Sequence, residues 1–221
     1  MALTRRMFAH LVASALLLRH LPALAQTPLT VAVGGSPGPN ITQRVVSAGA
    51  PADMLLLAVA PEKLVGLSSF DLSRQTAIPF HDDIRALPKL GRLAGRASTL
   101  SLEALLALKP DLVVDCGNAD ETWLSQARQV SAQTHIPWLL INGELRHTPE
   151  QLRAAGEALG VVSRTAMQAA LARRFIDNAI AFSHTAAANL RFYAARGARG
   201  LETGLQGSLH TEAAELLGLQ N

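Results

Sequence analysis

The stretch Ser98-Thr-Leu-Ser-Leu-Glu-Ala-Leu-Leu-Ala-Leu-Lys109-Pro-Asp-Leu-Val-Val-Asp-Cys116 decides the fold. Its leucines recur at helical spacing as far as Leu108. Pro110 ends this helix because proline lacks an N–H donor and disfavours the helical conformation in the residue before it. Residues 112–114, Leu-Val-Val, then form a short apolar run that is typical of a strand buried on both faces of a parallel sheet.

The same alternation of helix and strand continues on both sides of this stretch. Apolar runs predict three further strands, at 44–47, 64–67 and 136–141. Amphipathic segments predict the intervening helices, at 52–60, 118–133 and 148–160. Strands separated by helices of this length indicate a parallel sheet with right-handed crossovers, as in Rossmann-like α/β folds.

Capping signals and breakers refine these predictions. Asn118 and Glu121 match a capping box at the start of one helix, and Thr148 and Gln151 match a second one. Residues 71–96 are polar and irregular, with two prolines. We therefore expect that segment to form a surface rim and not a core element.

The first 25 residues have the pattern of an export signal. Arg5 and Arg6 precede an apolar run at 7–18, and Ala23-Leu-Ala25 fits a small-residue cleavage site. The run is too short to cross a hydrocarbon core of ~30 Å, which needs ~20 residues. We expect residues 1–25 to be a signal peptide that directs the protein to the periplasm. The paired arginines favour the twin-arginine route over the general secretory route.

Most of the basic excess of the chain lies in this leader. The sequence has 20 Lys and Arg against 17 Asp and Glu. Arg5, Arg6 and Arg19 belong to the leader, which has no acidic residue, so the remaining chain is balanced. A balanced chain lacks the electrostatic footprint by which proteins bind phosphate backbones. Nucleic acid is therefore not an expected partner.

A long helix and the start of another unit follow the first lobe. Apolar residues recur at helical spacing over 164–184, a length of about 31 Å at 1.5 Å per residue. Residues 190–193 predict a strand and residues 209–217 a final helix. We expect an N-terminal α/β lobe at 26–163, a connecting helix at 164–184, and an incomplete second α/β lobe at 185–221.

Five motifs, taken in order, carry a family resemblance: Leu-Pro-Lys-Leu-Gly-Arg-Leu-Ala-Gly at 87–95, Ser-Leu-Glu-Ala-Leu-Leu-Ala-Leu-Lys-Pro-Asp at 101–111, Thr-His-Ile-Pro-Trp-Leu-Leu at 134–140, Ala-Gly-Glu-Ala-Leu-Gly at 155–160, and Tyr-Ala-Ala-Arg-Gly-Ala-Arg-Gly-Leu-Glu-Thr-Gly at 193–204. Together they resemble the periplasmic substrate-binding proteins of ABC importers for iron–siderophore complexes, haem and cobalamin. The resemblance implies two lobes joined by one long helix, with the ligand between them and no resident cofactor.

The resemblance also implies a partner. In such proteins an acidic residue on each lobe docks onto arginines of an ABC permease in the inner membrane, and Glu103 occupies the position on the first lobe. The second lobe normally repeats the serine–leucine–glutamate pattern, and this sequence contains no second copy. We therefore expect a C-terminally truncated member of that class.

Ligands in such folds bind beyond the carboxyl ends of the strands. The expected cleft loops are 47–51, 68–70, 117–123, 142–144 and 193–202. From these loops we select six candidate ligand contacts: Ser47, Phe70, Trp123, Tyr193, Arg196 and Glu202. Trp123 and Tyr193 offer rigid contact area to a large chelate, although Trp123 also suits a core position. Arg196 and Glu202 can pair with a charged chelate or with one another.

The sequence contains no recognisable catalytic or metal-binding constellation. The serine-hydrolase, zinc-protease and phosphate-loop motifs are absent, and the histidines after the leader are scattered singly. Cys116 ends a predicted buried strand, where a thiol behaves as a small hydrophobe. We expect no enzyme and no metal site, but an exported solute-binding component of an ABC importer. The alternative is a truncated, transport-incompetent product or a single-lobe interaction domain.

Overall fold

The computed structural model describes residues 28–35, 38–73, 80–95, 98–185 and 190–221. Its strands are β1 (Thr30–Val33), β2 (Val45–Ser47), β3 (Leu112–Gly117) and β4 (Trp138–Asn142). Its helices are α2 (Ala50–Val59), η2 (Pro61–Lys63), α3 (Asp82–Arg85), α4 (Leu102–Ala107), α5 (Glu121–Thr134), η3 (Leu145–His147), α6 (Thr148–Leu159), α7 (Val162–Ser183) and α8 (Glu212–Leu216). The predicted signal peptide at 1–25 and its export route lie outside the described residues.

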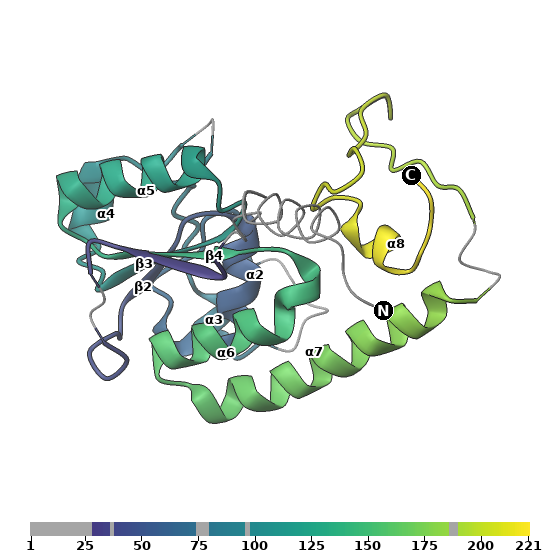
Figure 1. Cartoon of the computed structure of the whole chain (residues 1–221). Helices are drawn as coiled ribbons and strands as arrows, with labels where there is room; N and C mark the ends of the chain where they lie inside the picture. The colour runs from purple at the N-terminus through teal and green to yellow at the C-terminus, as the bar shows by residue number, and fades with distance from the viewer. Residues whose placement is uncertain (1–27, 36–37, 74–79, 96–97, 186–189) are drawn as a thin grey trace, which may run out of the picture.

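The four strands form one sheet in the order β1-β4-β3-β2. β2, β3 and β4 run parallel, and β1 lies antiparallel to β4 at the edge. Helices cover both faces of the sheet (Figure 1). The predicted α/β class with a mainly parallel sheet is confirmed, and the antiparallel first strand is the addition that the helix–strand alternation did not indicate.

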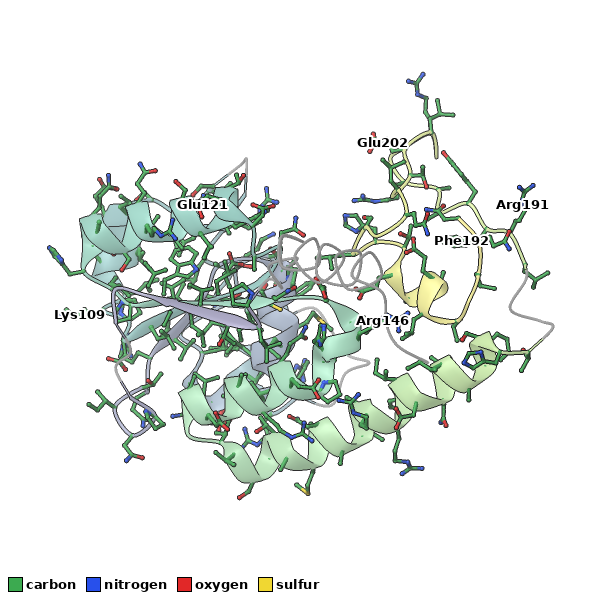
Figure 2. The ribbon with its side chains drawn as sticks, viewed as in Figure 1. Lys109, Glu121, Arg146, Arg191, Phe192 and Glu202 are labelled. Carbon is green, nitrogen blue, oxygen red and sulfur yellow. The ribbon has the colours of Figure 1, made fainter. Side chains whose placement is uncertain are left out.

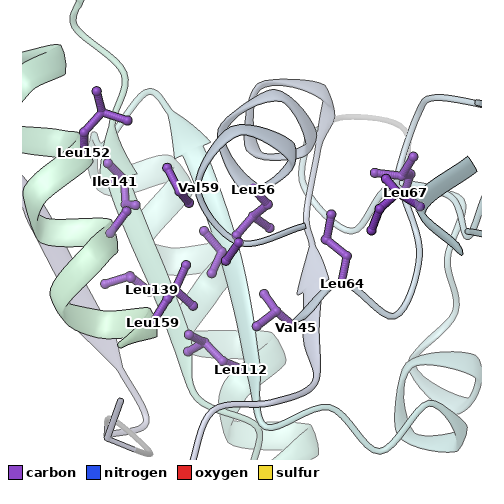
Figure 3. Packing of buried hydrophobic residues seen from close by; sticks show 14 of the residues in the cluster. Val45, Leu56, Val59, Leu64, Leu67, Leu112, Leu139, Ile141, Leu152 and Leu159 are labelled. Atoms are coloured by element: carbon purple, nitrogen blue, oxygen red, sulfur yellow. The ribbon is translucent and has the colours of Figure 1, made fainter. Parts of the chain in front are cut away.

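The sheet has a hydrophobic core on each of its two faces. Successive residues of a strand pack into opposite cores, because their side chains point alternately to the two faces. Val45, Val114 and Ile141 pack with α2 and α6 on one face, where Leu56 and Leu159 are fully buried (Figure 3). On the other face, Val46, Val113 and Trp138 pack against α4 and α5. The sheet is therefore buried on both sides, as the apolar run at 112–114 predicted.

The turn between α4 and β3 shows why the opening motif folds as it does. Ser101 caps α4 by accepting the N–H of Ala104 at 3.2 Å. After Leu108 the chain reverses through Lys109, whose φ is 47°. Asp111 then accepts the N–H groups of Gln43 and Arg44, each at 2.8 Å. One carboxylate thereby joins the start of β3 to the start of β2.

Two predicted features of the first lobe are wrong. Residues 64–67 form only isolated pairings, Val45 with Leu64 and Leu67 with Lys89, and not a strand. The segment 71–96 is not merely a surface rim, since Ile84 and Leu93 are buried in the two cores. Its last part is attached to Ala48, the residue after β2, whose carbonyl accepts the N–H groups of residues 93 and 94.

The caps of α5 and α6 also differ from the prediction. Asp120, and not Asn118, caps α5, and its Oδ1 accepts the N–H of Thr122 at 2.9 Å. α6 has no side-chain cap; the hydroxyl of Thr148 instead donates to the carbonyl of Leu145. Gly160 ends α6 with a φ of 69°, as its position predicted.

Helix α7 has 22 residues and corresponds to the connector predicted at 164–184. It begins two residues earlier than predicted, at Val162, and ends one residue earlier, at Ser183. It packs along α6 at a close approach, where a Cβ on Gly156 would meet the Oγ1 of Thr165 at 1.8 Å. Beyond this contact α7 runs past the lobe towards residues 190–221 (Figure 1). Among the described residues, no helix is long and apolar enough to cross a membrane.

We name residues 190–221 the C-terminal segment. The strand expected at 190–193 is absent from this described segment; Phe192 instead donates its N–H to Gln220, whose N–H donates to Leu190. The expected helix at 209–217 is shortened to α8. The division into a lobe, a connector and an incomplete second lobe stays a prediction.

Candidate functional site

A cavity of about 640 Å³ lies where the parallel strands end. The first lobe contributes residues after β2, β3 and β4 and from the first turns of α2 and α5, and residues 207–210 of the C-terminal segment complete the lining. Carboxyl ends of parallel strands are where open α/β sheets bind ligands. Four of the five predicted cleft loops contribute to the cavity, and the fifth, 193–202, is replaced by 207–210.

The first wall is the start of α2, held in place by a buried carboxylate. Asp53 is fully buried and accepts the N–H of Ser68 at 2.8 Å, its hydroxyl at 2.9 Å, and the N–H of Ser69 at 2.9 Å. Ser69, Ala50 and Pro51 line the cavity. Asp53 does not line the cavity itself, but it fixes the position of the loop that carries Ser69.

The end of β3 brings a carboxyl and a thiol to the cavity. Asp115 is 5% exposed, and its Oδ1 accepts the N–H of Cys116 at 2.9 Å. Burial raises the pKa of Asp115 to about 6. Burial, with a smaller contribution from the charge of Asp115, raises the pKa of the Cys116 thiol to about 12. Cys116 is therefore a protonated thiol at neutral pH and not a nucleophile.

The end of β4 is ordered by a network around Glu144. Asn142 accepts the N–H of Glu144 at 3.1 Å, and Gln151 donates to the carbonyl of Glu144 at 2.6 Å. The Glu144 carboxylate lies 3.4 Å from Nε2 of His147. Asn142 and Glu144 thus line the cavity with their hydrogen-bonding groups already engaged.

Trp123 lines the cavity from the first turn of α5 and also packs against the core. The segment that includes Leu93 and Gly95 lies next to this ring. Gln126 of α5 holds the segment in place: its side chain accepts the N–H of Gly95 at 3.2 Å and donates to the carbonyl of Leu93 at 3.1 Å. A Cβ on Gly95 would lie 3.7 Å from the indole. Trp123 therefore packs against the core and lines the cavity, and its contact with a ligand stays a prediction.

The other five predicted contacts lie outside the cavity lining. Ser47 is buried and donates to the carbonyl of Gly49 at 3.0 Å, and Phe70 packs against the core. Three of the five belong to the C-terminal segment: Tyr193, Arg196 and Glu202. Tyr193 donates its hydroxyl to the carbonyl of residue 200, and Arg196 and Glu202 pair through their backbones. Their ligand roles stay predictions.

Glu103 also lies away from the cavity, exposed on α4. Its own backbone N–H and the hydroxyl of Ser101 lower the pKa of its carboxyl. An ionised, solvent-facing carboxylate is what a docking contact with a cationic partner needs, and this role of Glu103 stays a prediction. Figure 2 shows Lys109, which follows α4, far from Glu202.

Three residues that line the cavity are not among those predicted from the sequence: Arg92, Asp115 and His210. Asp115 carried a signal, since an acidic residue interrupts an otherwise apolar strand. His210 carried none, because its place depends on how the C-terminal segment returns to the lobe. No group of three His, Cys, Asp or Glu residues that could hold a metal occurs in the part of the chain that the structure describes.

No family model and no curated protein matches the chain. Solved structures do. An ABC transporter solute-binding protein from Sulfurospirillum deleyianum is 24% identical, with a TM-score of 0.69 over 83% of this chain and 58% of that one. The periplasmic heme-binding protein RhuT from a Roseiflexus species is 22% identical, with a TM-score of 0.57 over 81% of this chain and 65% of that one.

A third structure, the periplasmic vitamin B12 binding protein BtuF of Vibrio cholerae, is 17% identical, with a TM-score of 0.63 over 81% of this chain and 66% of that one. The chain thus spans 58% to 66% of these three proteins. The predicted likeness to the binding proteins of ABC importers is confirmed in the fold.

Proposed function

We propose that the protein is the exported solute-binding component of an ABC importer. It captures an iron chelate, a haem or a cobalamin-like complex in the cavity at the strand ends and delivers it to a permease in the inner membrane. The periplasm is its place of action, and the role is binding rather than catalysis.

One observation supports this proposal most strongly: the cavity of about 640 Å³ between the first lobe and residues 207–210. Pockets of about 300–1,000 Å³ suit small organic ligands and cofactors. The cavity lies at the edge of the sheet where α/β folds bind ligands, and Trp123 offers a broad ring to a planar or bulky chelate.

Trp123 also supplies the test, because the chain has two tryptophans and the other, Trp138, is buried in the core. The full chain is titrated with haemin, ferrioxamine B and cyanocobalamin, and tryptophan fluorescence and the thermal midpoint are followed. We expect saturable quenching and a raised Tm with at least one of them, since a ligand that binds only the folded state stabilises it.

The variant Trp123→Phe is expected to lose most of the quenching and to bind that ligand more weakly. Phe175→Leu, which changes an exposed ring on α7 outside the cavity lining, is the control and retains both. If all three ligands leave the fluorescence and the Tm of the wild-type chain unchanged, the proposed function is wrong.

A second candidate, a single-lobe interaction domain without ligand delivery, has one observation in its favour. Met167, Leu171 and Phe175 are exposed at a spacing of four residues on α7, so they share one face of the helix. Exposed apolar patches mark interaction surfaces. In that case the thermal transition is insensitive to all three ligands and the chain associates with itself or with another protein.

A further inference from the structure

Asp115 is the buried carboxylate of the cavity, and one of its oxygens has an open hydrogen-bonding position. It is 5% exposed and lines the cavity. Its Oδ1 accepts the N–H of Cys116, and no hydrogen bond from any described residue reaches its Oδ2. Oδ2 is not fully enclosed, so a donor in the cavity can reach it. A charge-assisted hydrogen bond from a ligand would offset the cost of burying the rest of the carboxyl group.

The other acidic groups of the cavity are less buried than Asp115. Asp120 is exposed, and its Oδ1 accepts N–H groups at the start of α5; Glu144 is half-buried, accepts from Asn142 and lies beside His147. The basic residues of the lining are Arg92 and His210. Three carboxylates and one permanent cation give the cavity a negative balance when the histidine is neutral. The open position at Asp115 therefore faces a site that favours positive charge.

Building on the proposed function, we propose that Asp115 selects metal chelates that carry a cationic nitrogen, whose N–H donates to Oδ2 of Asp115 in the cavity wall. The same contact disfavours chelates of equal size that present a neutral or a carboxylate group there. Asp115 thus acts as the determinant of ligand charge, while Trp123 contributes contact area.

The pH dependence follows from the groups that face the cavity: Asp115, Asp120, Glu144, His210 and Arg92. The pKa of Asp115 is about 6, so the contact with a cation is present above pH 6 and is lost as Asp115 takes up a proton. The preference for a cation therefore falls as the pH falls.

The test uses two ferric chelates that differ in one charge. Ferrioxamine B carries a terminal ammonium group, and its N-acetylated derivative carries a neutral amide at the same position. Both are titrated into the full chain at pH 7.5 and pH 5, with tryptophan quenching and calorimetry as readouts. We expect ferrioxamine B to bind about tenfold more tightly at pH 7.5, the effect of one charge-assisted hydrogen bond, and the preference to shrink at pH 5.

Asp115→Asn keeps the acceptor for the Cys116 N–H but removes the charge, and we expect it to abolish the preference. The control is Asp177→Asn, the same change on an exposed position of α7 outside the cavity lining; it should keep the preference. Equal binding of both chelates to the wild type, or equal loss in both variants, overturns the role of Asp115 and leaves the proposed function standing. If neither chelate, nor haemin, nor cyanocobalamin binds the wild type, both proposals fail.

Discussion

Both carboxylate oxygens of Glu212 accept the backbone N–H of Leu145, each at 2.8 Å. Glu212 begins α8 in the C-terminal segment, and Leu145 begins η3, three residues after the last residue of β4. This contact joins the C-terminal segment to the lobe beside the cavity, whose lining includes residues 207–210. The site is therefore built from two parts of the chain that one charge-assisted hydrogen bond holds together.

Glu212→Ala is expected to loosen this attachment without unfolding the lobe. Hydrogen exchange should become faster at the Leu145 amide and over residues 207–210, and the affinity for the bound chelate should fall about tenfold, the effect of one hydrogen bond to a charged group. Glu157→Ala, on an exposed position of α6, is the control. Exchange that is unchanged at Leu145 would show that the contact does not order the segment.

Asp115→Asn is expected to stabilise the protein in a pH-dependent manner. The pKa of Asp115 is about 6 in the folded chain, whereas the ordinary pKa of an aspartate is 3.8. The folded state holds the proton more tightly, so this carboxyl lowers stability above pH 6 and has no such effect below about pH 4. A shift of this size corresponds to about 3 kcal/mol.

The measurement is urea unfolding of the wild type and of Asp115→Asn at pH 4, 6 and 7.5. The variant should be more stable by about 1–3 kcal/mol at pH 7.5, and the difference should vanish towards pH 4. A difference that is constant with pH would contradict the raised pKa and point to a packing effect.

Asp53→Ala is expected to be strongly destabilising, because three donors from Ser68 and Ser69 would lose their buried acceptor. Each buried donor that is left without an acceptor costs about 1–3 kcal/mol. Asp177→Ala, an exposed position on α7, should change stability by less than about 0.5 kcal/mol. Denaturant unfolding of both variants decides the point; an Asp53 variant as stable as the control would remove the role given to this carboxylate.

Glu103→Ala is expected to leave chelate affinity unchanged and to reduce uptake by cells that carry the cognate permease, since the residue is exposed and outside the cavity lining. Glu157→Ala serves as the control for removing an exposed carboxylate elsewhere. Uptake that Glu103→Ala leaves intact would remove the docking assignment from this residue.

The elements with strong local signals could be predicted from the sequence. Pro110 and the run at 112–114 locate the end of α4 and the start of β3, and Gly160 ends α6 as predicted. What could not be predicted depends on contacts between distant parts of the chain. The carbonyl of Ala48 draws residues 93 and 94 inward, and nothing in the polar composition of 71–96 indicates this. Asp120 competes with Asn118 as a cap, and spacing alone does not decide between them.

For the site, the rule on strand ends identified the correct loops of the first lobe, because it depends only on strand direction. Apart from Trp123, it did not identify the individual side chains: Ser47 donates its hydroxyl to the carbonyl of Gly49, whereas Asp115, two residues before the predicted loop at 117–123, lines the cavity. The position of His210 follows from the attachment of Glu212 to Leu145, a contact between polar groups that no sequence pattern marks.

The placement of β1 has a consequence for the order of folding. β1 comes first among the strands of the described residues, where it pairs only with β4, with Thr30 opposite Ile141. Closing such a long loop carries an entropic penalty that is offset only after distant contacts form. During synthesis, β1 therefore stays unpaired until β4 has left the ribosome. The earliest of these four strands to be made can pair only with the one that is made last.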